Sequence, residues 1–383
     1  MIGPLNPSPP AIVPARPEIL SVPPATHGAL DYAELQSLKL DPGQVLDFSV
    51  NGNAFGASPR VGRALAGLPL ERYPDREALA LRSALSQRLG LSPEEVVVGN
   101  GAAELLWLVA MAFLQPGDRA VVIGPTFGEY ARVAALMGAA VHTWTARPAS
   151  GFQVVPDEVA ALLRRVQPRL VFVCNPNNPT GVLLPAEALA GWAAQHPQAL
   201  FVVDEAYAFF APGLRSALAL RAANVLVVRS MTKDYALAGL RLGYAAGARP
   251  VITAISQVRP AWNVNAFAQA AGLAALADEA HQQACLSALL AAKAALVADL
   301  EKAGLAPLPS AVHFFLVPVG DAAAFRRALL RQGILVRDCT SFGLPAYVRI
   351  ATRRPEENAR LLAAVTGLRP PSPATRRLIA DGC

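Results

Sequence analysis

The chain has 383 residues, of which 53% are hydrophobic and 16% are charged. A chain this long and apolar can bury a large core, so its composition excludes global disorder and allows two or three domains. The net charge of +6 comes from scattered arginines without a basic run that includes aromatic residues, and four dispersed cysteines and five dispersed histidines form no close group. We therefore expect no nucleic-acid surface, disulfide framework or metal site.

The N-terminal 24 residues contain eight prolines and no basic start. They predict an extended or disordered arm rather than a signal peptide. The most apolar run, at 105–114, is too short to cross a membrane, so we expect a cytoplasmic protein. The tail after Leu368 is also rich in proline, and residues 376–380 could add a short turn of helix.

Short runs rich in apolar and β-branched residues alternate with Ala/Leu-rich stretches through the first two thirds of the chain. This alternation predicts an α/β fold with a mostly parallel central sheet and helices on both faces. Buried strands are expected at 96–98, 119–123, 170–174, 200–204 and 224–229. Helices are expected at 102–114, 129–137, 157–165 and 186–195.

The pattern changes near residue 260. Residues 266–303 are Ala-rich and predict a long helix that kinks or breaks near its middle, and predicted strands at 313–318, 335–337 and 347–351 flank a helix at 322–332. These elements predict a smaller α+β unit. The expected domains are a proline-rich arm with a small-domain segment (1–45), a large domain (46–260), a small domain (261–367) and a tail (368–383).

Unusual residues follow each predicted strand of the large domain. Because the carboxyl ends of parallel strands meet at one edge, where open α/β sheets bind ligands, we expect these residues to surround one crevice. They are Gly99-Asn100-Gly101, Pro125-Thr126-Phe127, the run Asn175 to Gly181, Asp204-Glu205-Ala206-Tyr207 and Ser230-Met231-Thr232-Lys233.

Two of these residues indicate a specific chemistry. A buried lysine such as Lys233, its charge disfavoured, can form a Schiff base with an aldehyde, although a solvated loop lysine is the commoner case. Asp204 ends a buried strand and needs a donor, which a pyridinium nitrogen would supply; the alternative is an Asp that caps a turn. The Gly99–Gly101 turn opens a helix whose free amides can bind phosphate, as can Ser230, Thr232 and Arg241.

Three segments together resemble the class I and class II aminotransferases. They are Asn175-Pro-Asn-Asn-Pro-Thr-Gly181, Asp204-Glu-Ala-Tyr207 and the run from Ser230-Met-Thr-Lys233 to Leu242-Gly-Tyr244. The resemblance covers roughly residues 27–365 and implies an enzyme with the type I fold that uses pyridoxal 5′-phosphate (PLP).

The resemblance also implies residue roles. Lys233 would hold PLP covalently, Asp204 would pair with the pyridine nitrogen, and Asn178 and Tyr207 would donate to the phenolic oxygen. The phosphate would be bound by the Ala102 and Ala103 amides, Ser230, Thr232 and Arg241, with Phe127 stacked on the ring. Tyr73 resembles a tyrosine that reaches the neighbouring subunit's phosphate, which implies a homodimer.

Within the family, the chain is similar to two branches, threonine-phosphate decarboxylase of cobalamin biosynthesis and histidinol-phosphate aminotransferase. Segments at 27–28, 99–104, 125–130 and 336–344 look more like the decarboxylase, whereas Ala29 and the segment 53–56 depart from its pattern. We therefore expect the decarboxylase ahead of the aminotransferase. The resemblance implies that a small phosphorylated amino acid or amine is bound by His27, Gly28, Asn51, Asn178, Arg337 and Arg349.

The number of arginines agrees with a phosphorylated substrate. With Arg241 committed to the cofactor, Arg337 and Arg349 remain for a carboxylate and a second anionic group, unless Arg337 is a surface residue. PLP cleaves whichever Cα bond stands perpendicular to its ring, so decarboxylation and transamination both remain open. The non-enzymatic alternative is a ligand sensor of the kind found in some transcription regulators.

Overall fold

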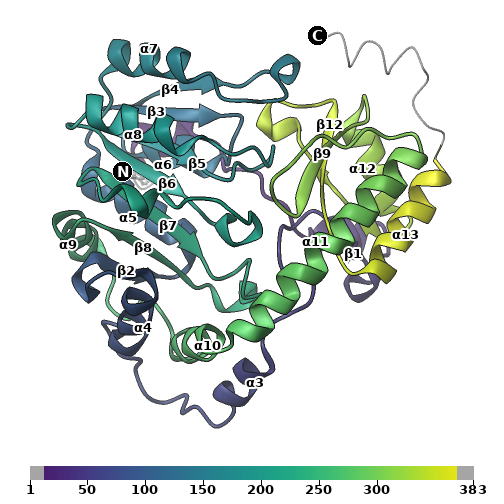
Figure 1. Cartoon of the computed structure of the whole chain (residues 1–383), viewed down its shortest axis with the longest axis horizontal. Helices are drawn as coiled ribbons and strands as arrows, with labels where there is room; N and C mark the ends of the chain where they lie inside the picture. The colour runs from purple at the N-terminus through teal and green to yellow at the C-terminus, as the bar shows by residue number, and fades with distance from the viewer. Residues whose placement is uncertain (1–12, 369–383) are drawn as a thin grey trace, which may run out of the picture.

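The computed structural model describes residues 13–368, which form a large unit beside a smaller C-terminal unit (Figure 1). The predicted turn of helix at 376–380 lies outside these residues. The large unit is built on a seven-stranded sheet of order β2-β8-β7-β6-β5-β3-β4. Its strands are β2 (Val96–Gly99), β3 (Arg119–Gly124), β4 (Ala140–Thr145), β5 (Leu170–Cys174), β6 (Leu200–Asp204), β7 (Val225–Ser230) and β8 (Gly243–Gly247).

The central sheet is parallel except for β8, which pairs antiparallel with both β2 and β7. This confirms the predicted mostly parallel sheet. Strand β8 was not predicted because its sequence, Gly-Tyr-Ala-Ala-Gly, has a low intrinsic preference for strands. Strand β4 was also missed, because it lies at the sheet edge and carries partly exposed residues in place of an apolar run.

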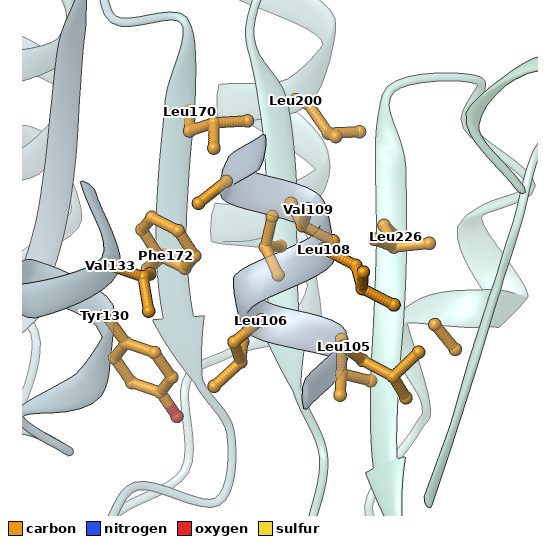
Figure 2. Packing of buried hydrophobic residues seen from close by; sticks show 14 of the residues in the cluster. Leu105, Leu106, Leu108, Val109, Tyr130, Val133, Leu170, Phe172, Leu200 and Leu226 are labelled. Atoms are coloured by element: carbon orange, nitrogen blue, oxygen red, sulfur yellow. The ribbon is translucent and has the colours of Figure 1, made fainter. Parts of the chain in front are cut away.

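Helices cover both faces of this sheet, as predicted. One face packs against α5 (Gly101–Phe113), α6 (Glu129–Leu136) and α9 (Arg249–Val258), and Figure 2 shows part of this cluster around Leu106, Val109 and Phe172. The opposite face packs against α7 (Pro156–Val166) and α8 (Ala186–Gln195). Successive residues of β5 alternate between the two clusters, which explains why every residue of this strand is apolar.

The smaller unit has a three-stranded antiparallel sheet of order β11-β12-β9. Its elements are α11 (Glu279–Lys302), β9 (Phe314–Pro318), α12 (Ala322–Leu330), β10 (Ile334–Leu335), β11 (Arg337–Asp338), β12 (Tyr347–Ala351) and α13 (Pro355–Thr366). Strand β1 (Leu46–Asp47) pairs with β10, and Phe48 is buried in the same core. Residues 46–48 therefore pack with the C-terminal unit, although the predicted boundary assigns them to the large domain.

The rest of the described chain contains shorter helices. They are α1 (Pro17–Ser21), α2 (Tyr32–Ser37), α3 (Pro59–Leu65), α4 (Leu79–Leu89) and α10 (Ala266–Leu276), with short 3-10 helices that include η7 (Thr340–Phe342). Helix α10 packs with α3 and α4 on the large unit, although its residues fall in the predicted small domain. The domain boundaries therefore stay a prediction. The packing differs from it at residues 46–48 and at α10.

Two local predictions were wrong, and a third, the break in the Ala-rich helix, was correct except in position. The N-terminal arm is helical at Pro17–Ser21, where proline occupies the first helical position and needs no hydrogen-bond partner. The Ala-rich helix breaks after Leu276 rather than near its middle, because the Asp278 side chain caps the next helix by accepting from His281 N at 3.4 Å. The strand predicted at 335–337 is divided between β10 and β11, which belong to different sheets.

Within residues 13–368, α11 is the one helix that is long and apolar enough to cross a membrane by length and composition. A single helix of this kind is weak evidence for a membrane span. Its buried residues, among them Cys285, Leu289, Leu296 and Leu300, recur every three or four positions and so share one side of the helix. Leu296 and Leu300 pack into the core of the smaller unit, and Leu289 packs into a cluster that also contains Tyr207 and Phe210 of the large unit.

Candidate active site

A cavity lies where the carboxyl ends of the central strands meet the N-terminus of α5. Every residue predicted to bind the cofactor lines it except Tyr73. The lining residues are Ala102, Ala103, Leu106, Phe127, Tyr130, Cys174, Asn178, Asp204, Ala206, Tyr207, Ser230, Thr232, Lys233 and Arg241. The expectation that polar strand ends surround one crevice is therefore confirmed.

One end of the cavity is built to receive an anion. Helix α5 begins there, and its first residue, Gly101, has a φ of +82°. A Cβ atom on Gly101 would lie 2.8 Å from Arg241 Nη2, and one on Gly243 would lie 2.6 Å from Ala102 N. Glycine at both positions lets the guanidinium and the helix amides share the site. The Ser230 and Thr232 hydroxyls add two donors and lie 2.6 Å apart.

The other end of the cavity carries a buried carboxylate. Asp204 accepts a hydrogen bond from the Tyr130 hydroxyl at 2.6 Å and another from Ala206 N at 2.9 Å. Burial raises the pKa of Asp204, and the hydrogen bond from Tyr130 opposes this shift. Sequence reasoning did not assign a role to Tyr130, since a tyrosine in the first turn of an apolar helix is usually part of the core.

Lys233 lines the same cavity and is near enough to Arg241 and Asp204 for both charges to act on its amine. Burial, together with the nearby charges of Arg349 and Arg241, lowers the pKa of its amine to about 8, and Asp204 opposes this shift. A substantial fraction of the amine is therefore neutral near physiological pH. A neutral amine can attack an aldehyde, as the Schiff-base interpretation of Lys233 requires.

Asn178 and Tyr207 lie on the side of the cavity that faces the smaller unit. The Asn178 side-chain oxygen accepts from Arg349, which leaves its amide nitrogen free to act as a donor. The Tyr207 hydroxyl accepts from Asn51 Nδ2 at 3.3 Å, and its ring packs edge-on against Phe314. Asn51 therefore contacts the predicted cofactor donor Tyr207, although the sequence assigned it to the substrate.

The two predicted substrate arginines face each other across paired strands. Arg337 on β11 and Arg349 on β12 are register partners and are 7% and 4% exposed, so the alternative that Arg337 is a surface residue is wrong. Arg349 donates to the Ser49 carbonyl at 2.5 Å, and Arg337 donates to the Thr26 carbonyl and to Ser341 Oγ, both at 2.7 Å. Both guanidinium groups are held in place by oxygen atoms of the protein.

The remaining substrate residues lie on the N-terminal segment. His27 contacts the Glu129 carboxylate at 3.2 Å and tilts over Phe127, with 5.3 Å between the ring centroids. A Cβ atom on Gly28 would lie 2.6 Å from the Ser49 carbonyl, so only glycine fits this approach. His27, Gly28 and Arg337 line a second cavity of about 370 Å³.

Tyr73 lies outside both of these cavities. Its side chain is 80% exposed and stacks on Trp262, with ring centroids 4.6 Å apart. An exposed aromatic pair of this kind is available to a partner. The predicted reach of Tyr73 into a neighbouring subunit stays a prediction.

The first cavity fits PLP by the chemistry of its donors. Helix amides, two hydroxyls and Arg241 suit a phosphate, Asp204 suits a pyridinium nitrogen, and Lys233, which lines the same cavity, suits an aldehyde. Phe127 contributes an aromatic ring to the wall. The arrangement can therefore hold PLP through its phosphate, its ring nitrogen and its aldehyde.

Comparisons with known proteins extend this picture. The family described as "Aminotransferase class I and II" matches residues 43–365. The chain is 40% identical over 322 residues to the histidinol-phosphate aminotransferase of Symbiobacterium thermophilum, a match that covers 82% of this chain and 88% of that relative.

Two solved structures are informative. The histidinol-phosphate aminotransferase of Sinorhizobium meliloti in complex with pyridoxal-5'-phosphate matches with a TM-score of 0.83 and 26% identity, over 94% of this chain and 98% of that one. The L-threonine-O-3-phosphate decarboxylase of Porphyromonas gingivalis matches with a TM-score of 0.74 and 26% identity, over 84% of this chain and 98% of that one. These likenesses confirm the predicted type I architecture.

Proposed function

The chain belongs to the aminotransferase class I and II family and is a PLP-dependent enzyme, and within this family we propose that it is a histidinol-phosphate aminotransferase. The 40% identity to a protein of that name, over most of both chains, carries the proposal. The sequence analysis placed threonine-phosphate decarboxylase first. The comparisons support the aminotransferase alternative better, because the decarboxylase is a structural neighbour at 26% identity, with a lower TM-score and a lower coverage of this chain than the Sinorhizobium meliloti aminotransferase.

The two buried arginines suit the anions of such a reaction. An aminotransferase alternates between two substrates, here a phosphorylated amine and a dicarboxylic amino or keto acid. Arg349, beside Asn178 at the cofactor cavity, is placed for an α-carboxylate, and Arg337, on the second cavity, is placed for a phosphate or a distal carboxylate. One pair of cations would therefore serve both substrates in turn.

The protein's own groups perform defined tasks in this reaction. When bound, PLP supplies an electron sink for the bonds of the substrate's Cα atom. Lys233 Nζ would hold the cofactor, and as a free buried amine, with a pKa of about 8, it would be placed to take up and return a proton at the substrate's Cα atom. Asp204 would keep a proton on the ring nitrogen, and Asn178 and Tyr207 would donate to the phenolic oxygen.

A test measures both half-reactions. The holoenzyme with histidinol phosphate alone should convert its PLP stoichiometrically to pyridoxamine phosphate, and 2-oxoglutarate should restore PLP and yield glutamate. The same protein with O-phospho-threonine alone should release no carbon dioxide catalytically. Catalytic release of carbon dioxide, without any keto acid, would instead identify a decarboxylase. If neither substrate reacts and a plain amino acid does, the assignment to phosphorylated substrates is wrong.

Two further expectations belong to this proposal. A cytoplasmic location follows from the sequence analysis, and a homodimer follows from the resemblance of Tyr73 to a residue that reaches a neighbouring subunit. The exposed Tyr73–Trp262 pair supports the second expectation, because it offers apolar surface on the large unit. A ligand sensor would have this fold but would turn over no substrate. The turnover assay described above therefore also tests the sensor alternative.

A further inference from the structure

We propose that Tyr130 is a positioning residue that keeps Asp204 ionised, so that the proton shared with the cofactor lies on the pyridine nitrogen rather than on the carboxyl group. The proposal concerns the cofactor and one pair of side chains. It therefore holds for either substrate, and its failure is distinguishable from failure of the proposed function.

The geometry gives the hydroxyl one clear task. Tyr130 Oη donates to Asp204 Oδ2 at 2.6 Å, which is the short distance expected when the acceptor is an ionised carboxylate. Ala206 N donates to the other oxygen, Oδ1. A carboxylate has about four lone-pair positions, so these two bonds leave room for a ring N–H donor.

Tyr130 is held rigidly at this point. Its side chain is 1% exposed, its ring stacks on Phe172 with an interplanar angle of 8°, and it meets the edge of Phe127 at 5.6 Å between centroids. Figure 2 shows the ring at the margin of the hydrophobic cluster, with its hydroxyl oxygen directed away from Val133 and Phe172. The aromatic packing therefore fixes the position of the Tyr130 hydroxyl. Phe127, which Tyr130 contacts, lines the cofactor cavity as well.

Among residues 13–368, no charged group stabilises the Asp204 carboxylate as directly as the Tyr130 hydroxyl does. The negative charge of Glu205 acts against ionisation of Asp204. Arg229 pairs with Glu205, at 2.8 Å, rather than with Asp204. Burial raises the pKa of Cys174 to about 12, so its thiol stays neutral and supplies no charge. Lys233 favours the carboxylate, but its contribution is lost whenever its nitrogen carries no positive charge.

The consequence for the cofactor depends on a competition for one proton. A carboxylate in a buried site prefers to be neutral unless donors stabilise its charge. With Tyr130 present, the ionised form is favoured and the ring nitrogen keeps the proton that makes it an electron sink. Without the hydroxyl, the proton should shift toward Asp204.

The test uses holoenzyme reconstituted with PLP that carries 15N at the ring nitrogen, in the absence of substrate. The 15N chemical shift separates a protonated from an unprotonated pyridine. We expect a protonated nitrogen in the parent protein between about pH 6 and pH 9, and loss of the proton within this range in Tyr130→Phe. The dissociation constant for PLP should rise at least about tenfold, because a hydrogen bond to a charged group is lost.

Two comparisons exclude a merely structural effect. Tyr347→Phe removes a hydroxyl from another largely buried tyrosine, in the smaller unit, and should leave the 15N shift unchanged. In the background of Asp204→Asn, adding Tyr130→Phe should weaken PLP binding no further, because the two residues act through one bond. If Tyr130→Phe retains the parent's 15N shift at every pH, or if its effect adds fully to that of Asp204→Asn, the proposal is wrong.

Discussion

Lys233 and Asp204 are buried ionisable groups whose pKa values burial moves toward neutrality from opposite sides. Burial lowers the pKa of Lys233 to about 8 and raises the pKa of Asp204 above its ordinary value. The Lys233 amine can therefore bind and release a proton near neutral pH, as proton transfer at the site requires. The hydrogen bond from Tyr130 opposes the effect of burial on Asp204, which favours the carboxylate.

Lys233→Ala should abolish covalent attachment of PLP. The parent protein should absorb in the near-visible range, and borohydride should fix PLP to Lys233, as peptide mapping can show. Lys293 is a matched control, because it is also a partly buried lysine and donates to the Ser310 carbonyl, away from the cofactor cavity. Lys293→Ala should retain attachment. Reduction of PLP onto another lysine in the Lys233→Ala protein would contradict the assignment.

Asp204→Asn should leave PLP bound but lower turnover by several orders of magnitude. The amide cannot stabilise a positive charge on the ring nitrogen, so the electron sink is lost while the phosphate contacts remain. Single-turnover kinetics with saturating PLP will measure this. Asp118→Asn, at the start of β3 and away from the cavity, is the control. Unchanged turnover in Asp204→Asn would mean that another residue protonates the ring.

Ala29→Gly should stabilise the fold by about 1 kcal/mol, because Ala29 has a φ of +118°, which side chains rarely adopt. Ala29 N donates to Ser49 Oγ at 3.0 Å, so this backbone geometry is held by the site. Denaturant unfolding measures the difference. Ala66→Gly, at a residue with a φ of −66°, should destabilise instead. Equal destabilisation by both changes would show that Ala29 carries no strain.

At the level of elements, the sequence predicted best those strands whose environment is uniform. The bounds of β5, β6 and β12 agree with the prediction, because each is a run buried on both faces and ended by a polar residue or turn. The site residues that lie at or just after the ends of β5 and β6 were predicted for the same reason. Tyr130 and the two halves of the 335–337 strand were missed, because tertiary contacts alone decide their roles.

The segment that leads into β9 predicts a dependence of stability on pH. His313 is fully buried against Phe210, and burial, with Arg349 and Lys293 nearby, lowers its pKa to about 3. An unfolded histidine has a pKa of about 6.5, so between these values the unfolded chain binds the extra proton. The contribution of His313 to stability is therefore complete above about pH 6.5 and is lost progressively as the pH falls toward 3.

Comparison with His313→Phe measures this effect. Between pH 7 and pH 5, the free energy of unfolding of the parent should fall relative to that of the variant by about 2 kcal/mol. His142→Gln, a partly buried position on the edge strand β4, serves as the control and should follow the parent. A difference between the parent and His313→Phe that is independent of pH would contradict the buried, neutral state.

At the scale of the molecule, the site depends on both units and on the N-terminal segment. Asp204 and Lys233 come from the large unit, and Arg337 and Arg349 come from the smaller one. Arg326 on α12 binds the two carboxylate oxygens of Glu34 on α2 at 2.7 and 2.5 Å, which ties the N-terminal segment to the smaller unit. The arrangement of the units therefore sets the distance between cofactor and substrate groups.

The proposed homodimer can be tested by mixing two defective proteins. If Tyr73 contributes to the neighbouring subunit's site, Tyr73→Ala should weaken PLP binding, and Lys233→Ala should be inactive. A mixed dimer of these two has one site with both residues intact, so mixing should restore activity to as much as about a quarter of the parent level when subunits exchange freely. Sedimentation should give twice the 40.2 kDa chain mass for the parent. Absence of any restoration, despite proven exchange, would contradict a shared site.

Strand β8 determines when the central sheet and the cofactor site can form during synthesis of the chain. It lies between β2 and β7, and Val98 pairs with Tyr244, so two neighbours in the sheet are separated by roughly 150 residues of chain. The strand also brings Gly243 against Ala102 N. A ribosome that has released β2 and α5 has therefore not yet supplied the strand that joins them to β7 and Lys233. Nascent chains stalled before residue 247 should fail to retain PLP, however complete their first helices are.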